Sequence, residues 1–250
     1  MTTRFKQSIR PPLFRWWGPV LILLALIRPA GAAVTIDAVY VAAIGNGLNP
    51  TDPAWSQATA TTVALDSVIG PTGVPQLLPT AQWRYLQVRA IHNGNQIFFR
   101  YEWADGTNNL SVADTPLFAD AVAMEIPFTV SSSIAMGNQR EPVNILYWRA
   151  DLVKPENLVS GGAGTVQKSP DSEALPISHS QSRTALPGSW TVIIQRPLQG
   201  TYNPPAQSGN LVTLNRGGNY RICFAQWDGA QEERNGLKMV AGSWQTLQVH

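Results

Sequence analysis

Few side chains in this sequence are arranged for acid–base or nucleophilic chemistry. The three histidines, His92, His179 and His250, are far apart, and no metalloprotease, serine-hydrolase or phosphate-binding motif is present. We expect each of them to be a surface histidine. Asp120 and Glu125 could form the carboxylate pair of a secreted hydrolase, but a solvated face explains them equally well. The sequence therefore specifies no catalytic site.

Two other residues are poorly explained by packing or by solvation. Met136 lies in residues 131–140, a polar stretch of small residues where a core thioether is not expected. Lys238 lies among apolar residues and is one of only four lysines in the chain. Their ordinary interpretations are a gap-filling methionine and a solvated lysine. The alternative is that both have a functional role.

The single cysteine, Cys223, excludes several kinds of site. It allows no intrachain disulfide, and no CxxCH motif is present for covalent attachment of c-type haem. Zinc and iron–sulfur sites built from several cysteines are excluded for the same reason. The fold must therefore be stabilised by its core alone.

The N-terminus has the pattern of a secretory signal. Five basic residues and no acidic residue accompany a mostly apolar run over 16–27 and a small-residue site at 30–32. We expect residues 1–32 to be a cleaved signal peptide for export to the periplasm, with an uncleaved anchor as the alternative. The run is too short for a stable membrane span. Without the five basic residues the formal charge changes from +2 to −3, which removes the support for a nucleic-acid partner.

Residues 33–250 are predicted to form a single all-β domain. An alternating hairpin is expected over 86–103, because Asn93-Gly94 favours a tight turn and Ile97, Phe99 and Tyr101 share one face. Further strands are expected at 35–42, 62–68, 121–128, 143–150, 190–197, 220–227 and 244–249. The pattern indicates an antiparallel β-sandwich. Residues 157–188 and 200–218 are rich in Ser, Gly and Pro, so we expect long loops there.

The chain resembles the haem b-binding gamma subunits of periplasmic molybdoenzymes of the dimethyl sulfoxide reductase type, such as ethylbenzene dehydrogenase, dimethylsulfide dehydrogenase, selenate reductase and chlorate reductase. The resemblance rests on short segments in a matching order along most of residues 103–244. These segments are Trp103-Ala104-Asp105-Gly106-Thr107, Phe118-Ala119-Asp120-Ala121, Met136-Gly137, Trp148-Arg149-Ala150-Asp151, Gly188-Ser189-Trp190, Ala225-Gln226-Trp227-Asp228-Gly229 and Gly236-Leu237-Lys238.

The resemblance implies a non-covalent haem b at one end of the sandwich, with Met136 and Lys238 as the axial ligands of the iron. Two other methionines compete for the role. We expect Met124 to lie in the core of a strand, and Met239 to point away from the side on which Lys238 lies. The implied fold, an antiparallel β-sandwich, agrees with the strand pattern.

The resemblance further implies an electron-transfer subunit with no catalytic site of its own. It would relay electrons between the iron–sulfur beta subunit of a complex, which also contains a molybdopterin alpha subunit, and a soluble c-type cytochrome. Two alternatives remain open from the residues. One is a secreted carbohydrate-binding β-sandwich module, because exposed tryptophans on such folds bind sugars. The other is a secreted sandwich hydrolase using a carboxylate pair.

Overall fold

The computed structural model describes residues 32–70, 72–112, 118–184, 188–202 and 210–250. All but the last residue of the predicted leader, residues 1–32, lies outside these ranges. Within them the helices are short 3-10 turns, η1 (Pro53–Gln57), η2 (Thr80–Gln82) and η3 (Gly229–Gln231). No helix in this part of the chain has the length and apolar character needed to cross a membrane.

Fifteen strands form one continuous hydrogen-bonded network, and the chain is an all-β sandwich as predicted. Eleven of them follow the order β10-β9-β8-β7-β13-β15-β1-β5-β6-β12-β11, and β2, β3, β4 and β14 branch from it. The bounds are β1 Thr35–Tyr40, β2 Thr61–Leu65, β3 Ser67–Ile69, β4 Pro75–Leu77, β5 Arg84–His92, β6 Gln96–Asp105, β7 Ala121–Pro127, β8 Val143–Arg149, β9 Glu156–Ser160, β10 Gln167–Lys168, β11 Ser178–Arg183, β12 Gly188–Pro197, β13 Asn219–Trp227, β14 Met239–Val240 and β15 Gln245–Val249.

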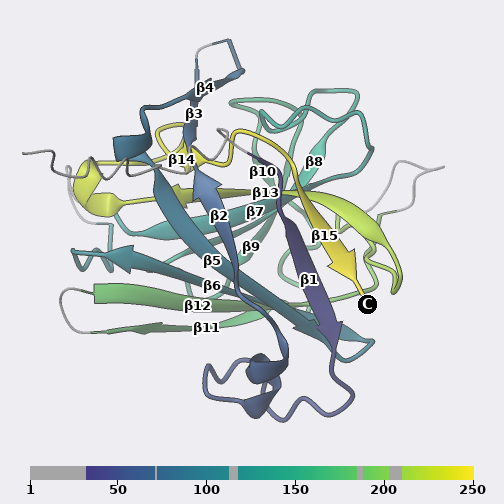
Figure 1. Cartoon of the computed structure of the whole chain (residues 1–250). Helices are drawn as coiled ribbons and strands as arrows, with labels where there is room; N and C mark the ends of the chain where they lie inside the picture. Colours follow the sequence, from purple (N-terminus) through teal and green to yellow (C-terminus); the bar gives the residue numbers. More distant parts are fainter. Residues whose placement is uncertain (1–31, 71, 113–117, 185–187, 203–209) are drawn as a thin grey trace, which may run out of the picture.

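Strand β13 joins the two layers of the sandwich. Its first half, Asn219 to Ile222, pairs with β15, and its second half, Cys223 to Trp227, pairs with β7. One layer therefore contains β15, β1, β2, β5, β6, β12 and β11, and the other contains β7 to β10 with β14, β3 and β4 (Figure 1). Because one strand serves both layers, its shift of partner sets how the layers face each other.

The core fills the space between these layers with large aromatic and aliphatic side chains. Trp103 of β6 lies 6.2 Å from Trp148 of β8 and 6.1 Å from Trp190 of β12, measured between ring centroids. Tyr101 donates a hydrogen bond from its hydroxyl to the sulfur of Met124, 3.1 Å away. Met124 is 1% exposed, so its predicted place in the core is confirmed. A buried aromatic side chain removes 150–250 Å² from water, so contacts of this kind dominate the stability of the core.

Three expectations from the sequence are wrong in detail. Residues 157–188 were expected to be one long loop, but they contain β10, β11 and parts of β9 and β12. The sequence did not predict β11 because this edge strand shows no apolar alternation. Strand β1 pairs in parallel with β15 and β5, whereas the other pairings are antiparallel. His92 is fully buried and not at the surface as expected. Its ring nitrogens are satisfied there, because Nε2 lies 2.6 Å from the carbonyl oxygen of His250 and Nδ1 accepts from the Gly94 amide.

Candidate functional site

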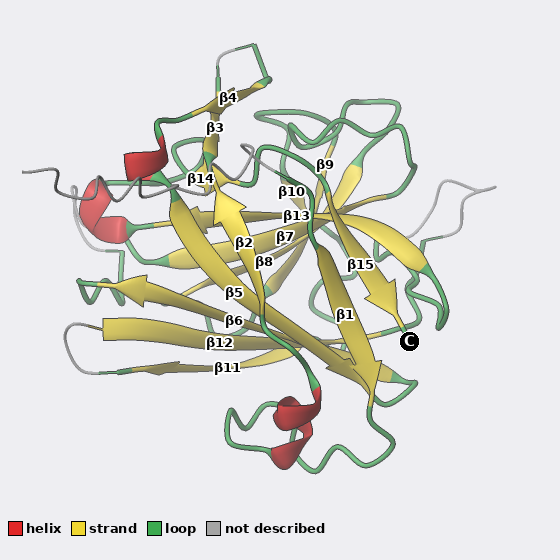
Figure 2. Cartoon of the chain, in the orientation of Figure 1, coloured by secondary structure: helices red, strands yellow, loops and turns green. Residues whose placement is uncertain are grey.

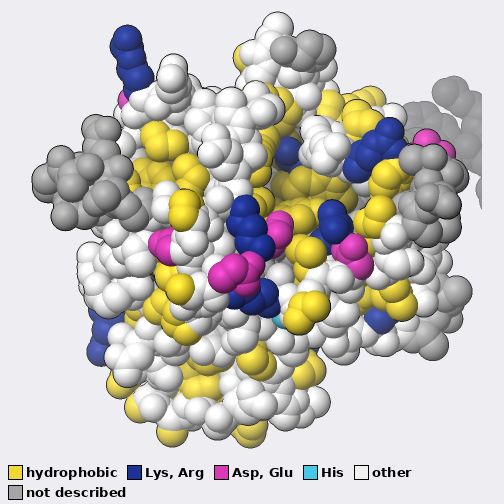
Figure 3. Space-filling model, turned by 180° about the vertical axis from the view of Figure 1, so that it is seen from behind, with side chains coloured by type: hydrophobic (Ala, Val, Ile, Leu, Met, Phe, Trp, Pro, Cys, Tyr) yellow, Lys and Arg dark blue, Asp and Glu magenta, His cyan; other side chains and the backbone are white. Residues whose placement is uncertain are grey.

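A cavity of about 670 Å³ opens on the outer face of the second layer. Strand alternation places it there: Val122 and Met124 of β7 point into the core, so Ala123 and Glu125 point the opposite way. Figure 3 shows the molecule from behind, where hydrophobic side chains line a hollow between charged groups. The size of the cavity falls in the range of small-molecule and cofactor sites.

The strand register places small side chains in the middle of the cavity floor, which is therefore flat. Ala225 of β13 pairs with Ala123 of β7, which pairs with Tyr147 of β8. In the neighbouring row Cys223, Glu125, Ile145 and Leu158 are paired in the same way. Two adjacent alanines leave room for a flat apolar group to lie against the sheet, while the larger residues around them form its border.

Met136 reaches this cavity from the loop that joins β7 to β8. Its backbone has a positive φ of 67°, and Gly137 follows at 72°. Positive φ is strained for a methionine and costs about 1–3 kcal/mol, so the surrounding contacts must hold it. Two of them are the bonds from the Gly137 amide to the Ser133 carbonyl and from the Gly162 amide to the Met136 carbonyl, both 2.8 Å. The loop therefore fixes where the thioether lies.

Gly137 cannot be replaced without moving this loop. A Cβ there would lie 2.7 Å from the Glu141 carbonyl oxygen, in addition to the cost of its positive φ. We expect Gly137→Ala to lower the free energy of unfolding in urea by about 2–4 kcal/mol. Gly164→Ala is the matched control, because its φ is 81° but its Cβ would meet nothing within 4 Å. An equal loss in both variants would contradict steric exclusion at Gly137.

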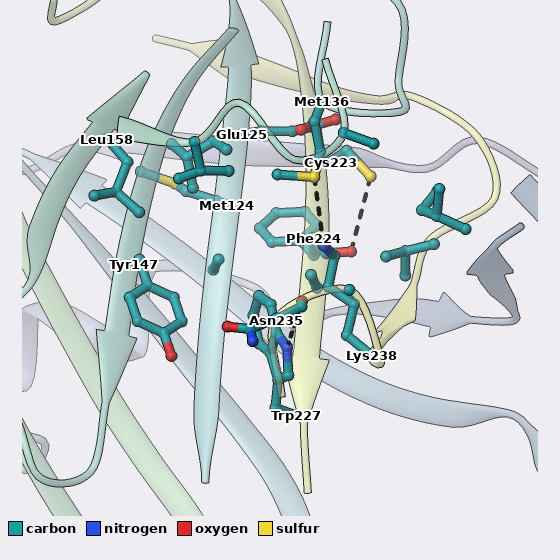
Figure 4. A pocket seen from close by; sticks show the side chains of 18 of the residues that line it. Met124, Glu125, Met136, Tyr147, Leu158, Cys223, Phe224, Trp227, Asn235 and Lys238 are labelled. Carbon is teal, nitrogen blue, oxygen red and sulfur yellow. Dashed lines mark hydrogen bonds between the residues drawn. The ribbon is translucent and has the colours of Figure 1, made fainter. Parts of the chain in front are cut away.

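Lys238 approaches the cavity from the opposite side. It follows a turn closed by the bond from the Leu237 amide to the Arg234 carbonyl, 2.8 Å, and precedes β14, which pairs Val240 with Ala225. Only 7% of the residue is exposed. Its Nζ lies 3.5 Å from the sulfur of Met136 and 5.3 Å from the centroid of the Trp227 ring. Figure 4 shows the Lys238 amine meeting the Met136 sulfur, with a dashed line between them.

The charges inside the cavity are incompletely paired. Burial lowers the pKa of Lys238, while the nearby Glu125 and Cys223 act in the opposite direction. Burial raises the pKa of Glu125 to about 8, although Lys238 lowers it. Glu125 Oε1 is buried without a hydrogen-bond partner, and the described residues show no ion pair between Lys238 and a carboxylate. A lysine that is buried without a counter-ion is readily held as the neutral amine, which can bind a metal.

The structure brings together the two residues that the sequence singled out, although they are 102 positions apart in the chain. Met239 packs into the main core, on the side away from Lys238, as expected from strand alternation. Sequence reasoning missed Glu125 and Trp227 as members of the cavity. For Glu125 a signal was present, because its position in the alternation of β7 is shared with Ala121 and Ala123 and not with the core residues.

The fold and the site together define a β-sandwich with a cofactor-sized pocket into which a thioether and an amine project. Residues 52–185 match the ethylbenzene dehydrogenase family. A protein of Haloferax mediterranei named as the haem subunit of a respiratory nitrate reductase is 31% identical, over 89% of this chain and 77% of the relative. The gamma subunit of chlorate reductase from Ideonella dechloratans is also 31% identical, over 86% of this chain and 85% of its own. The chain belongs to the ethylbenzene dehydrogenase family.

Solved structures with this architecture have little sequence in common with the chain. A carbohydrate-binding protein of Bacteroides uniformis superposes with a TM-score of 0.51 at 11% identity, covering 88% of this chain and 100% of that structure. At such low identity the likeness shows a common fold alone. It gives no support to a sugar site on this chain.

Proposed function

We propose that this chain is an electron-transfer subunit without catalytic activity of its own, and that it binds haem b non-covalently in the cavity between Met136 and Lys238. The observation that supports this most directly is the 3.5 Å approach of the Lys238 amine to the Met136 thioether within a buried, cofactor-sized space. Relatives named as haem and gamma subunits of oxidoreductases support the same cofactor and the same type of role.

The residues present suit the proposed group. The thioether of Met136 and the amine of Lys238, 3.5 Å apart, are a sulfur donor and a nitrogen donor that would together hold the iron. The flat floor at Ala123 and Ala225 suits a planar macrocycle. No cluster of three or more His, Cys, Asp or Glu is found in the described ranges, so a metal held by protein side chains alone is not indicated there.

Bound haem would supply one-electron chemistry at its iron. Met136 would contribute a soft sulfur donor, which favours the ferrous state and raises the reduction potential. Lys238 would bind as the neutral amine, a form that its burial favours. With the iron held by both side chains, the group would transfer electrons without binding a substrate.

The proposed partners follow from the resemblance noted in the sequence and not from a surface of this chain. They are the iron–sulfur beta subunit and the molybdopterin alpha subunit of the same complex, with a soluble c-type cytochrome as the external carrier. The proposed location is the periplasm, with residues 1–32 as the export signal that is then cleaved. The family match supports a gamma-type subunit, and each named partner is part of the proposal.

The test is to add haem b to the purified chain and follow its absorption and electron paramagnetic resonance spectra. We expect uptake of one haem per chain with a low-spin spectrum, and extraction of intact haem b by acidified solvent. Failure to take up haem would contradict the proposal, as would a high-spin haem that binds cyanide as readily as free haem does. Calorimetric titration with soluble glycans in the same preparation tests the carbohydrate-binding alternative, which predicts binding heat without haem uptake.

A further inference from the structure

The turn that precedes Lys238 is tied to the end of strand β13 by a tryptophan. Trp227, the last residue of β13, is 8% exposed, and its Nε1 donates a hydrogen bond to the Asn235 carbonyl, 3.1 Å away. Asn235 has a positive φ of 51°, the left-handed conformation that asparagine adopts more readily than most residues. The indole hydrogen bond therefore ties this turn, three residues before Lys238, to the end of β13.

The ring of Trp227 also limits where the lysine can lie. Its centroid is 5.3 Å from Lys238 Nζ, and Tyr147 packs against the ring edge-on at 5.4 Å with an interplanar angle of 81°. Figure 4 shows Trp227 beside Asn235 and Lys238 at one wall of the cavity. The ring is thus held by Tyr147 and in turn bounds the space open to the amine.

We propose that Trp227 is a positioning residue that holds Lys238 in place to serve as a haem ligand. Its Nε1 fixes the turn over residues 234–237, and its ring restricts the amine to the side that faces Met136. The inference rests on the proposed haem function and adds a residue that touches the ligand lysine and its turn without itself being a ligand. A ligand that is fixed before binding loses less conformational freedom when it binds, so competing ligands displace it less easily.

The test is Trp227→Phe in the haem-loaded chain, because phenylalanine keeps an aromatic ring and removes the donor. Imidazole is titrated in, and loss of the low-spin resonance of the lysine-ligated iron is followed, with Lys238→Ala as the reference for complete loss. We expect displacement at about fivefold lower imidazole, the factor that corresponds to one hydrogen bond.

Trp55→Phe is the matched control. The Trp55 indole donates to the Gly47 carbonyl at 3.2 Å, and Arg100 lies over its ring at 5.8 Å, but it packs in a separate hydrophobic cluster. We expect this variant to need the same imidazole concentration as the unsubstituted chain. Asn235→Gly serves as a second test that is safe for folding, because glycine adopts positive φ freely. It loosens the same turn and should shift displacement in the same direction.

The outcomes separate this inference from the proposed function. If Trp227→Phe and Asn235→Gly retain the unsubstituted imidazole dependence while Lys238→Ala loses the resonance, the positioning role is wrong and the haem assignment stands. An equal shift in Trp55→Phe also overturns the positioning role, because it shows general loosening. If Trp227→Phe does not fold, Trp227→Tyr, which also lacks the indole donor, decides. No haem uptake by the unsubstituted chain overturns both the inference and the proposed function.

Discussion

Replacing Lys238 with alanine should convert the bound haem from low-spin to high-spin and raise its dissociation constant more than about 100-fold. The estimate follows from the 10–100-fold losses caused by removing groups that merely support a metal ligand, because a ligand itself contributes at least as much. Met136→Ala should weaken binding in the same way, since its thioether is the facing donor at 3.5 Å. Absorption spectra and transfer of haem to apomyoglobin measure both effects.

Two substitutions serve as controls for these variants. Lys154→Ala removes a lysine whose Nζ contacts the carbonyl oxygens of Ser172 and Glu173, at 3.1 and 2.8 Å, and which does not line the cavity. Met239→Leu changes a thioether that packs into the core and does not line the cavity. Both should keep the low-spin spectrum. If Lys238→Ala and Met136→Ala also keep it, with unchanged affinity, the ligand assignment is wrong.

The stability of the haem-free chain should fall as the pH rises from 5 to 8, because of Glu125. Burial raises the pKa of this carboxyl to about 8 from its ordinary value of 4.5, so the folded chain holds its proton more tightly than the unfolded chain does. Its stabilising contribution is complete below the unfolded pKa and is lost as the pH rises through the folded pKa. Compared with Glu125→Gln, we expect a relative loss of about 3 kcal/mol over this window.

Urea unfolding at pH 5, 6.5 and 8 measures this loss. Glutamine is neutral at all three values, so subtracting its curve removes the titrating groups that do not interact with Glu125. The difference reports the titration of Glu125 together with its effect on Lys238. Glu232→Gln is the control, because that side chain is exposed and its replacement should leave the pH dependence unchanged. Parallel curves for the unsubstituted chain and Glu125→Gln would show that Glu125 ionises normally in the folded chain.

The strands that carry the core could be predicted from the sequence because alternation reports one buried face. β5, β6, β7, β8, β12, β13 and β15 were all expected within a few residues of their observed bounds. β11 could not be found in this way, because its sequence Ser178–Arg183 is polar on both faces and is defined only by its hydrogen bonds to β12. The parallel pairing of β1 likewise depends on strands distant in sequence, and no local pattern encodes it.

The pairing of Met136 with Lys238 was expected from the resemblance, whereas the rest of the cavity depends on tertiary contacts. Glu125 is an unusual member of the cavity because its carboxyl shares a cross-strand row with the apolar residues Ile145 and Leu158. That row exists only once β7, β8 and β9 are in register. The Asn235-Gly236 pair favours a turn with positive φ, but the hydrogen bond that Trp227 donates to that turn depends on the position of the end of β13. The sequence predicts which face of a strand a residue occupies, but not which residues of other strands lie beside it.

The pairing of β13 with both layers has a consequence for the order in which the chain can fold and bind a cofactor. Its second half supplies Cys223, Ala225 and Trp227 to the cavity wall, and the residues up to Lys238 follow it in the chain. The other lining residues come earlier in the chain, except Val240 of β14. If the chain binds haem as proposed, the cofactor could be held only after β13 and the segment up to Val240 are in place, so loading would follow their completion.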